Sequence, residues 1–335
     1  MSGMVTDPFR ERSAGALRRR FAVLGVRVEF RSDSRRLLAL AKAAFGGLPT
    51  HRLRRGAPSF TVRLVLARGD RIERDTPPPM RLGGVAGVLT GIMDADNYAV
   101  IAPRERAALV SVSRAMLRVP RLARYELIEF ATLTLLARAL PLVSLHAGCL
   151  GRAGHGLMLL GESGAGKSTL GLQALVDGVD YLAEDSLFAT IDARLATAVP
   201  AFLHVQQQTL KFLDGHALAR RIRGSPVIER RSGVRKFELD LRGAGIRVAP
   251  GPLRLRAVVL LSRRHAGKGA MLRPLARAAL LRALDRSQPQ QHGRPEWSGF
   301  RARVATLPAF ELRRAAHPRA GLDALRALLV PRRLK

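Results

Sequence analysis

In the first third of the chain, short runs in which every second residue is apolar surround one run with helical spacing. Residues 26–30 alternate between apolar and polar side chains, a pattern typical of a half-buried strand. Asp33 or Ser34 can cap the start of the helical run, and Gly46-Gly47 can end it. We therefore expect a small α+β module that is rich in antiparallel strands. Its predicted strands are 21–30, 60–66, 98–101 and 108–112, and its predicted helix is 37–44.

A long apolar helix is predicted to follow this module. It begins at Leu122 and must end before Pro141, because proline lacks the N–H that a helix interior needs. We place a domain boundary near Pro120, which gives an α+β accessory module over 1–120 and a second domain over 121–335. No chemical motif indicates a function for the first module.

The second domain is predicted to be of the α/β class. Two apolar strands, 146–150 and 156–160, are joined by a turn-rich segment, which predicts a hairpin. A Gln/Pro-rich stretch over 286–297 is expected to be a mobile loop. The other predicted elements are strands 179–183, 187–191, 257–261 and 309–312, helices 276–284 and 322–329, and a helix that ends near 178.

One segment fits the phosphate-binding pattern G-x-x-x-x-G-K-[ST], between a predicted strand and a predicted helix. Its glycines let successive backbone N–H groups point at phosphates, and Lys167 can reach the β and γ phosphates. Ser168 can help to hold Mg²⁺, and the positive end of the following helix favours anions. We therefore expect ATP and Mg²⁺ as ligands. The predicted phosphate-binding residues are Gly161, Glu162, Ser163, Gly164, Ala165, Gly166, Lys167, Ser168 and Thr169.

An acidic pair, Glu184-Asp185, follows the next predicted strand. Because the chain returns through one helix and one strand, the pair can lie beside the phosphate loop at the carboxyl end of its strand. One carboxylate can then support Mg²⁺, and the other can accept a proton from an attacking hydroxyl. A solvated surface turn is the alternative interpretation of the pair.

The formal net charge of the chain is +31, and 51 of its 57 basic residues are arginines spread along its length. Together with abundant alanine, glycine and proline, this composition is typical of a G+C-rich coding bias, with polyanion binding as an incidental property. A nucleic acid or an anionic membrane surface is the alternative partner. An acidic protein or peptide substrate is compatible with both interpretations.

The sequence argues against disulfide bonds, metal sites in two places, and segments that would enter or cross a membrane. The single cysteine, Cys149, excludes an internal disulfide and a cysteine-rich zinc site. Asp94, Asp96 and Asn97 could bind a cation, but a polar hairpin turn is the favoured interpretation. No stretch is apolar over the roughly 18 residues that a membrane span needs, and residues 1–12 lack the apolar core of a signal peptide. We therefore expect a cytoplasmic protein without a transmembrane segment.

The hairpin, the phosphate loop and the acidic pair together resemble the catalytic domain of HPr kinase/phosphorylase. More narrowly, they resemble the HPr-kinase-related serine kinases found in peptide-modification gene clusters. The resemblance covers roughly residues 142–330. It implies an α/β phosphate-loop core with a mixed sheet, shared with phosphoenolpyruvate carboxykinase, in which an antiparallel hairpin feeds the loop. It also allows a homo-oligomer, because bifunctional members of the family form hexamers.

The resemblance further implies roles for single residues. Glu184 falls where the family has a first aspartate, the base toward the substrate serine. Asp185 falls on the second aspartate, and we favour it as the essential carboxylate. His146 matches a histidine that precedes the loop, with a core histidine bonded to backbone as the alternative.

A second, downstream resemblance lies in Leu239–Ile246, which echoes the family's E-x-R-G-x-G segment. There Arg242 could bring a bidentate cation to a transferring phosphoryl group, and Asp240 could support the metal. A strand followed by a Gly-rich turn is the alternative. The predicted catalytic residues are thus Asp185, Glu184, Lys167, His146 and Arg242, and the predicted metal ligands are Ser168, Asp185 and Asp240.

Our leading functional hypothesis is a Mg²⁺–ATP-dependent kinase that phosphorylates a serine hydroxyl of a protein or peptide, with a peptide-modification pathway as the setting that the resemblance suggests. A small-molecule kinase is an alternative, because the loop and the acidic pair do not specify the acceptor. Others are a basic nucleic-acid-binding module and a regulatory ATP-binding protein without transfer activity, in which Glu184 cannot replace aspartate. A transporter ATPase is disfavoured, because the chain lacks an L-S-G-G-Q segment.

Overall fold

The computed structural model describes residues 16–53, 58–67, 77–213, 215–243 and 245–329. The chain divides into two compact units, each an α/β arrangement of helices and mixed sheets. The first unit comprises residues 1–46 and 56–140, and the second comprises 47–55 and 141–335. Among the described residues, no helix is both long and apolar enough to cross a membrane.

A seven-stranded sheet with the order β1-β2-β3-β7-β6-β5-β4 forms the first unit. The pairs β2–β3 and β3–β7 are parallel and the other pairs are antiparallel, so the sheet is mixed rather than purely antiparallel. The strands are β1 (Leu17–Val23), β2 (Val26–Ser32), β3 (Ser59–Ala67), β4 (Arg81–Val85), β5 (Val88–Ile92), β6 (Tyr98–Ala102) and β7 (Ala107–Ser113).

Two features of this sheet differ from the prediction. The segment expected to be one strand over 21–30 is a hairpin, because Leu24 and Gly25 both take positive φ angles, of 46° and 81°, and reverse the chain. Strands β4 and β5 were not predicted, and their exposed, glycine-containing sequence lacks the alternation that marks a half-buried strand. The segment 94–97 is a turn, in which the Asp94 carboxylate accepts hydrogen bonds from the backbone N–H groups of Asp96 and Asn97.

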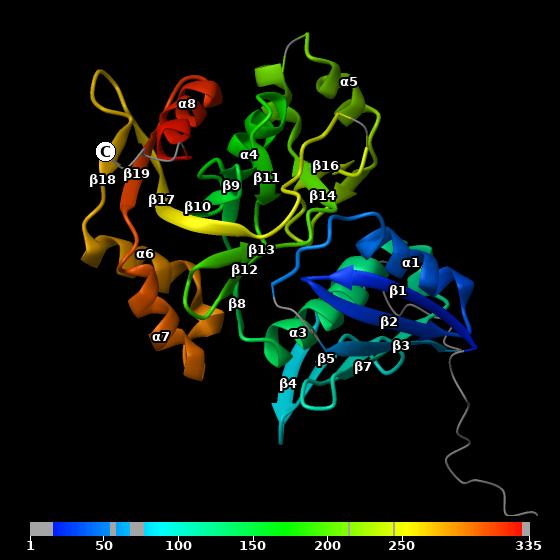
Figure 1. The fold of residues 1–335 in the computed structure, drawn as a ribbon. Helices are drawn as coiled ribbons and strands as arrows, with labels where there is room; N and C mark the ends of the chain where they lie inside the picture. The colour runs from blue at the N-terminus through cyan, green and yellow to red at the C-terminus, as the bar shows by residue number, and fades with distance from the viewer. Residues whose placement is uncertain (1–15, 54–57, 68–76, 214, 244, 330–335) are drawn as a thin grey trace, which may run out of the picture. The chain divides into compact units, whose positions relative to one another are not determined.

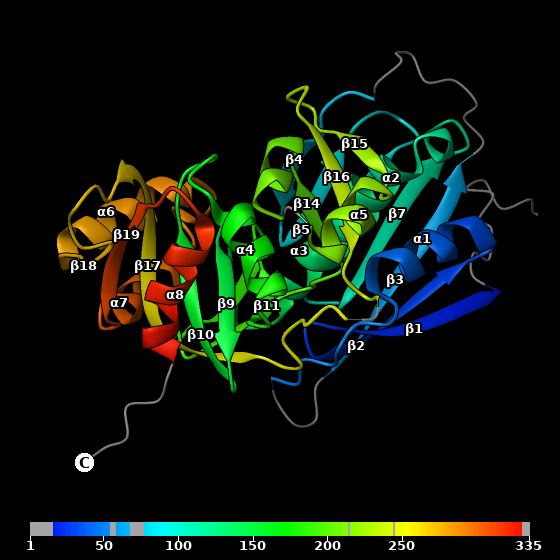
Figure 2. The same cartoon turned by 90° about the horizontal axis from the view of Figure 1, so that it is seen from above.

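Helix α1 (Arg35–Phe45) covers one part of this sheet beside β1 and β2 (Figure 2). The Ser34 hydroxyl accepts a hydrogen bond from the Leu37 N–H at 3.4 Å, as expected of a residue that caps a helix. The apolar face of the helix, which includes Leu37 and Phe45, is buried.

The long apolar helix belongs to the first unit. It consists of α2 (Pro120–Leu122), a π-helical stretch η2 (Ala123–Glu129) and α3 (Phe130–Ala139). Helix α3 contacts β6 and β7, and Phe130 lies over Gly91 of β5, where a Cβ atom would come within 2.7 Å of its ring. The units therefore divide after residue 140, whereas the sequence suggested a boundary near Pro120, before the helix that completes the core of the first unit.

The second unit contains a nine-stranded mixed sheet. Seven strands follow the order β11-β9-β10-β17-β13-β12-β8, while β19 pairs with β17 and with β18. The hairpin predicted before the phosphate loop is confirmed as β9 and β10. The strands are β8 (Leu142–Leu145), β9 (Gly148–Arg152), β10 (His155–Leu160), β11 (Asp180–Ala183), β12 (Leu187–Thr190), β13 (Leu195–Thr197), β17 (Leu253–His265), β18 (Leu272–Pro274) and β19 (Ala309–Arg314).

Both faces of this sheet are covered by helices. Leu157 and Leu159 of β10 belong to the core beneath α4 (Lys167–Val176) and α8 (Pro318–Leu329). The next residues, Met158 and Leu160, belong to a second core beneath α6 (Arg277–Ser287) and α7 (Pro295–Val304). This alternation explains why β10 reads as a continuous apolar run. Figure 1 shows α6 and α7, in orange, across β17 from α4 and α8.

The expectation of a mobile loop over 286–297 is wrong. The stretch contains the end of α6, a 3₁₀ turn η4 (Pro289–Gln291) and the start of α7, where Pro295 occupies the first turn. Gln288 is fully buried, and Trp297 belongs to the core. Glutamine and proline here serve packing and helix initiation.

A smaller sheet, β14-β16-β15, lies in the insert that follows β13. Its strands are antiparallel, and the buried residues of β14 and β16 join the core that packs on α4. The elements are β14 (Phe202–Val205), η3 (Gln207–Leu213), α5 (Ala217–Arg223), β15 (Val227–Glu229) and β16 (Arg235–Asp240).

His51 explains why the segment 47–53 belongs to the second unit. The residue is 2% exposed, Nδ1 of its ring lies 2.9 Å from the Thr197 hydroxyl, and Nε2 lies 3.0 Å from the Ala249 carbonyl oxygen. A proton on Nε2 donates to the carbonyl, and Nδ1 then accepts from the hydroxyl. Burial lowers the pKa of His51 below its usual value of 6.5, although the bond to Ala249 opposes this shift.

This burial predicts acid sensitivity. Because the folded state holds His51 neutral and the unfolded state binds its proton more readily, its contribution to stability is complete above the usual pKa and is lost as the pH falls below it. Replacing His51 by Gln should lower the free energy of unfolding at high pH by about 1–3 kcal/mol and weaken its dependence on pH. Urea unfolding between about pH 8 and pH 5 measures both effects. An unchanged pH dependence in His51→Gln, with exposed His317→Gln as control, would contradict this account.

Candidate functional site

The direction of three strands brings the phosphate loop and the acidic pair to the same edge of the sheet. Strand β9 pairs antiparallel with both β10 and β11, so β10 and β11 run in the same direction. The loop follows β10 and Glu184-Asp185 follow β11, and both therefore lie at carboxyl ends. Gly148 of β9 permits the close approach, because a Cβ atom there would lie 3.2 Å from the Ala183 carbonyl oxygen.

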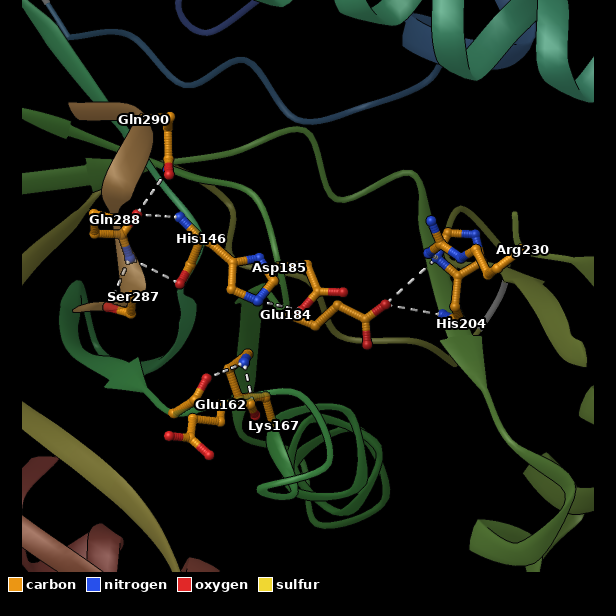
Figure 3. A network of polar contacts seen from close by, with 11 residues as sticks. His146, Glu162, Lys167, Glu184, Asp185, His204, Arg230, Ser287, Gln288 and Gln290 are labelled. Atoms are coloured by element: carbon orange, nitrogen blue, oxygen red, sulfur yellow. Dashed lines mark hydrogen bonds and ion pairs between the residues drawn. The ribbon is translucent and has the colours of Figure 1, made fainter. Parts of the chain in front are cut away.

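The phosphate loop has a backbone that depends on glycine. Gly164 and Gly166 have φ angles of 79° and 108°, in the region that side-chain-bearing residues rarely adopt, and α4 begins directly afterwards at Lys167. The Lys167 ammonium donates a hydrogen bond to the Gly161 carbonyl oxygen at 2.5 Å and approaches that of Glu162 at 3.5 Å (Figure 3). Burial lowers the pKa of Lys167, and the charges of Asp185 and Glu184 oppose that shift. The lysine thus lies within the loop and close to the acidic pair.

Arg263 also contacts the loop, and the sequence analysis did not identify it. The residue lies near the end of β17, which pairs parallel with β10, and its Nη2 donates to the Ser163 carbonyl oxygen at 2.5 Å. A signal existed in the sequence, because Arg263 and Arg264 lie just beyond the predicted apolar strand 257–261. Which strand would neighbour the loop strand could not be deduced from that signal.

The two carboxylates of the acidic pair have different surroundings. Glu184 is buried, with 7% of its surface exposed, whereas the Asp185 side chain is 39% exposed. Burial by itself would raise the pKa of Glu184, but hydrogen bonding and charge from His204, together with the Ser168 hydroxyl, outweigh it and lower the pKa. Glu184 is therefore an ionised, enclosed group, and Asp185 is accessible from solvent.

His146 lies beside Asp185, as Figure 3 shows, with its Nε2 3.9 Å from the nearer carboxylate oxygen. Burial lowers the pKa of His146, and the neighbouring Asp185 charge opposes this shift. A hydrogen bond between the His146 ring and the Asp185 backbone also opposes the shift, so the ring is held beside the acidic pair.

Gln288 holds the backbone of His146 in place. Its Oε1 accepts a hydrogen bond from the His146 N–H at 2.8 Å, and its Nε2 donates to the His146 carbonyl oxygen at 3.0 Å. Gln291 makes a similar contact nearby, where its Nε2 donates to the Ser144 carbonyl oxygen at 2.5 Å. The sequence analysis missed both glutamines, which lie more than 140 residues from their partners.

On the other side of the pair, Glu184 faces His204 on β14. Oε1 of Glu184 accepts from the His204 backbone N–H at 3.2 Å and lies 3.4 Å from Nδ1 of the ring. The ring reaches Glu238 on the neighbouring strand β16, with Nε2 3.2 Å from its Oε1, and Arg230 lies 3.0 Å from Nδ1. The sequence analysis did not identify His204, Glu238 or Arg230.

The downstream pair Asp240 and Arg242 is joined internally. Asp240 Oδ1 accepts from Nε of Arg242 at 2.8 Å, and Oδ2 accepts from Nη2 at 2.7 Å. The guanidinium group of Arg242 lies over the Phe202 ring, 4.9 Å from its centroid. Hydrogen bonding from Arg242 lowers the pKa of Asp240 against the effect of burial. Both carboxylate oxygens thus contact Arg242, although the Asp240 side chain is 49% exposed.

Within the described ranges, no group of three or more His, Cys, Asp and Glu side chains is arranged to hold a metal ion by itself. A Mg²⁺ ion that arrives with a nucleotide does not need such a group, because phosphate oxygens and water supply most of its ligands. Ser168 and Glu184 fit this arrangement, because the hydroxyl faces the carboxyl group and Oε2 of Glu184 is buried without a hydrogen-bond partner.

No protein-family model and no curated protein matches this chain. Among solved structures, the chain is similar to the HPr(Ser) kinase/phosphatase from Coxiella burnetii, with 13% identity over 56% of this chain and 87% of that chain. The TM-score is 0.25, which indicates only a distant structural relationship. We therefore base the functional interpretation on the residues of the site.

The Gln288 contacts predict a positional effect on His146. Replacing Gln288 by Ala leaves the His146 N–H and carbonyl groups without these partners, so the free energy of unfolding should fall by about 1–3 kcal/mol. Denaturant unfolding measures this loss. Gln290→Ala is the matched control, because the exposed Gln290 donates a hydrogen bond to the Gln288 side chain and not to the backbone of His146. Equal effects of the two changes would contradict the assignment.

Proposed function

We propose that the second unit binds Mg²⁺–ATP and transfers the γ-phosphate to a serine hydroxyl of a protein or peptide. The observation that carries this proposal is the convergence of a glycine-dependent phosphate loop, containing Lys167, with the Glu184-Asp185 pair at the same edge of the sheet. Phosphoryl transfer requires mainly positioning and charge neutralisation, which this set of groups supplies.

The nucleotide side of the reaction is assigned to the loop. Backbone N–H groups of residues 161–169 and the amino end of α4 would bind the phosphates, and Lys167 would exchange its contact with the Gly161 carbonyl for a phosphate oxygen. Ser168 and Glu184 would hold the hydrated Mg²⁺, which neutralises charge on the β and γ phosphates. This use of Glu184 follows from its burial and its unpartnered oxygen.

The acceptor side is assigned to Asp185. Its exposed carboxylate would accept the proton of the serine hydroxyl while the hydroxyl oxygen attacks the γ-phosphorus atom. The bond between that phosphorus and the bridging oxygen of ADP breaks, and ADP leaves with the electron pair. The neutral ring of His146 borders the same space and would orient the hydroxyl or Asp185.

Arg242 is proposed to face the transferring phosphoryl group. Asp240 and Phe202 fix the plane of its guanidinium group, which matches the geometry for bidentate contact with phosphate oxygens. In this proposal Asp240 orients Arg242, and a metal-binding role for Asp240 is the alternative that its bonds to Arg242 disfavour.

We also propose a preference of the site for acidic acceptors, because the chain carries a large positive charge. A chain with a net charge of +31 attracts acidic molecules, so a serine flanked by acidic residues should be a better acceptor than one flanked by basic residues. Cytoplasmic location, a peptide-modification pathway and a homo-oligomeric state complete the proposal.

Two results would favour the alternative functions. Transfer of label only to a small alcohol would favour a small-molecule kinase, and ATP binding without transfer would favour a regulatory protein.

Replacing Lys167 by Ala should reduce phosphoryl transfer by about a hundredfold or more, because a buried donor to developing charge is lost. Transfer from γ-labelled ATP with Mg²⁺ to serine-containing peptides measures this effect. Lys268→Ala is the control, because Lys268 is exposed in a turn. Full activity of Lys167→Ala would exclude the loop as the catalytic nucleotide site.

Replacing Asp185 by Asn should reduce the rate of transfer by about 10²–10⁴-fold, the usual contribution of a general base, while the affinity for Mg²⁺–ATP changes little. Single-turnover rates and nucleotide binding separate these quantities. Asp192→Asn, in an exposed turn after β12, serves as control. If Glu184→Gln abolished the proton transfer and Asp185→Asn had no effect, the two assigned roles would be reversed.

A further inference from the structure

Three buried titratable side chains form a row, of which the proposed transfer step uses only Glu184. Glu184, His204 and Glu238 are 7%, 9% and 8% exposed. Burial of two carboxylates disfavours folding unless each finds donors, and here the His204 imidazole between them supplies N–H donors while the guanidinium group of Arg230 beside it supplies positive charge. Such an arrangement fixes the position of every member.

Strand pairing sets the position of the ring. His204 on β14 and Glu238 on β16 lie directly opposite each other in the antiparallel register, so their side chains share one face of the small sheet. The ring proton on Nε2 faces the Glu238 carboxylate, which fixes the plane of the imidazole. Nη2 of Arg230, on a third segment of the chain, lies 3.0 Å from Nδ1.

This fixed ring determines where the oxygens of Glu184 lie. Both the backbone N–H and Nδ1 of His204 lie against the same oxygen, Oε1, at 3.2 and 3.4 Å. The other oxygen, Oε2, is buried and has no hydrogen-bond partner. A buried acceptor without a partner carries a penalty that a bound cation or its hydration water would remove.

We propose that His204, oriented by Glu238, is a positioning residue that holds Glu184 by Oε1 and thereby presents Oε2 to the Mg²⁺ ion of a bound nucleotide beside Ser168. This inference rests on the proposed function, because it requires a Mg²⁺–nucleotide in the loop. It adds a role for the insert between β13 and β17, whose small sheet carries His204 and Glu238. The insert is thus part of the metal site.

The test measures Mn²⁺ binding by electron paramagnetic resonance, as a probe for Mg²⁺, in the full chain saturated with ADP. His204→Ala should weaken Mn²⁺ binding by about 10–100-fold, the usual cost of losing a residue that orients a metal ligand, while ADP binding without metal is unchanged. His204→Asn places an amide near the position of Nδ1 and should restore most of the affinity. His204→Gln, which reaches toward Glu238 instead, should restore less. His317→Ala, at an exposed position, should behave as wild type.

A double variant shows whether His204 acts through Glu184. His204→Ala combined with Glu184→Gln should bind Mn²⁺ no more weakly than Glu184→Gln alone, because the carboxylate to be positioned is already absent. Additive losses, or unchanged Mn²⁺ binding in His204→Ala, would overturn the inference. If His204→Ala does not fold, the same Mn²⁺-binding assay is applied to three other variants: His204→Asn, His204→Gln and Glu238→Gln. Unchanged Mn²⁺ binding in both His204→Gln and Glu238→Gln would then overturn the inference. Failure of the wild-type chain to bind ADP would instead overturn the proposed function, and this inference with it.

Discussion

The position of β9 between β10 and β11 is the constraint on which the rest of the site depends. A strand that pairs antiparallel with both neighbours makes those neighbours run in the same direction, so the segments that follow them meet at one edge. The phosphate loop and the acidic pair meet for this reason, although a helix separates them in the sequence. Gly148 allows the approach, because no side chain stands between β9 and the carbonyl groups that end β11.

Balanced charge inside the site is the second condition. Lys167, Glu184, His204 and Glu238 are all buried, and isolated charges in such surroundings would oppose folding. The ammonium group of Lys167 is near both members of the acidic pair, and the imidazole of His204 lies between two carboxylates. These contacts keep the groups that the proposed function assigns to a phosphate and a metal ion in defined positions.

Patterns within short stretches of the sequence predicted the features that neighbouring residues determine, such as turns and helix caps. Glycine spacing identified the loop, Ser34 capped its helix as expected, and the turn-rich joint gave the β9–β10 hairpin. The contacts that complete the site could not be deduced, because a glutamine or a histidine carries no sign of its partner. Gln288 reaches His146 across 142 residues, and Arg263 reaches the loop across 100. For the same reason, polar composition at 286–297 suggested a mobile loop where packing around Trp297 forms helices.

The two adjacent carboxylates illustrate how environment separates residues of the same chemistry. A glutamate has one methylene more than an aspartate, and Glu184 extends into the buried space beside Ser168 and His204. Donors there lower its pKa, and a weakly basic carboxylate suits a cation better than it suits a proton. Asp185 stays short and exposed beside His146, where an acceptor can approach. The substitution that made the pair look atypical in the sequence is thus consistent with a division of roles, in which the longer side chain supports the metal and the shorter one receives the proton.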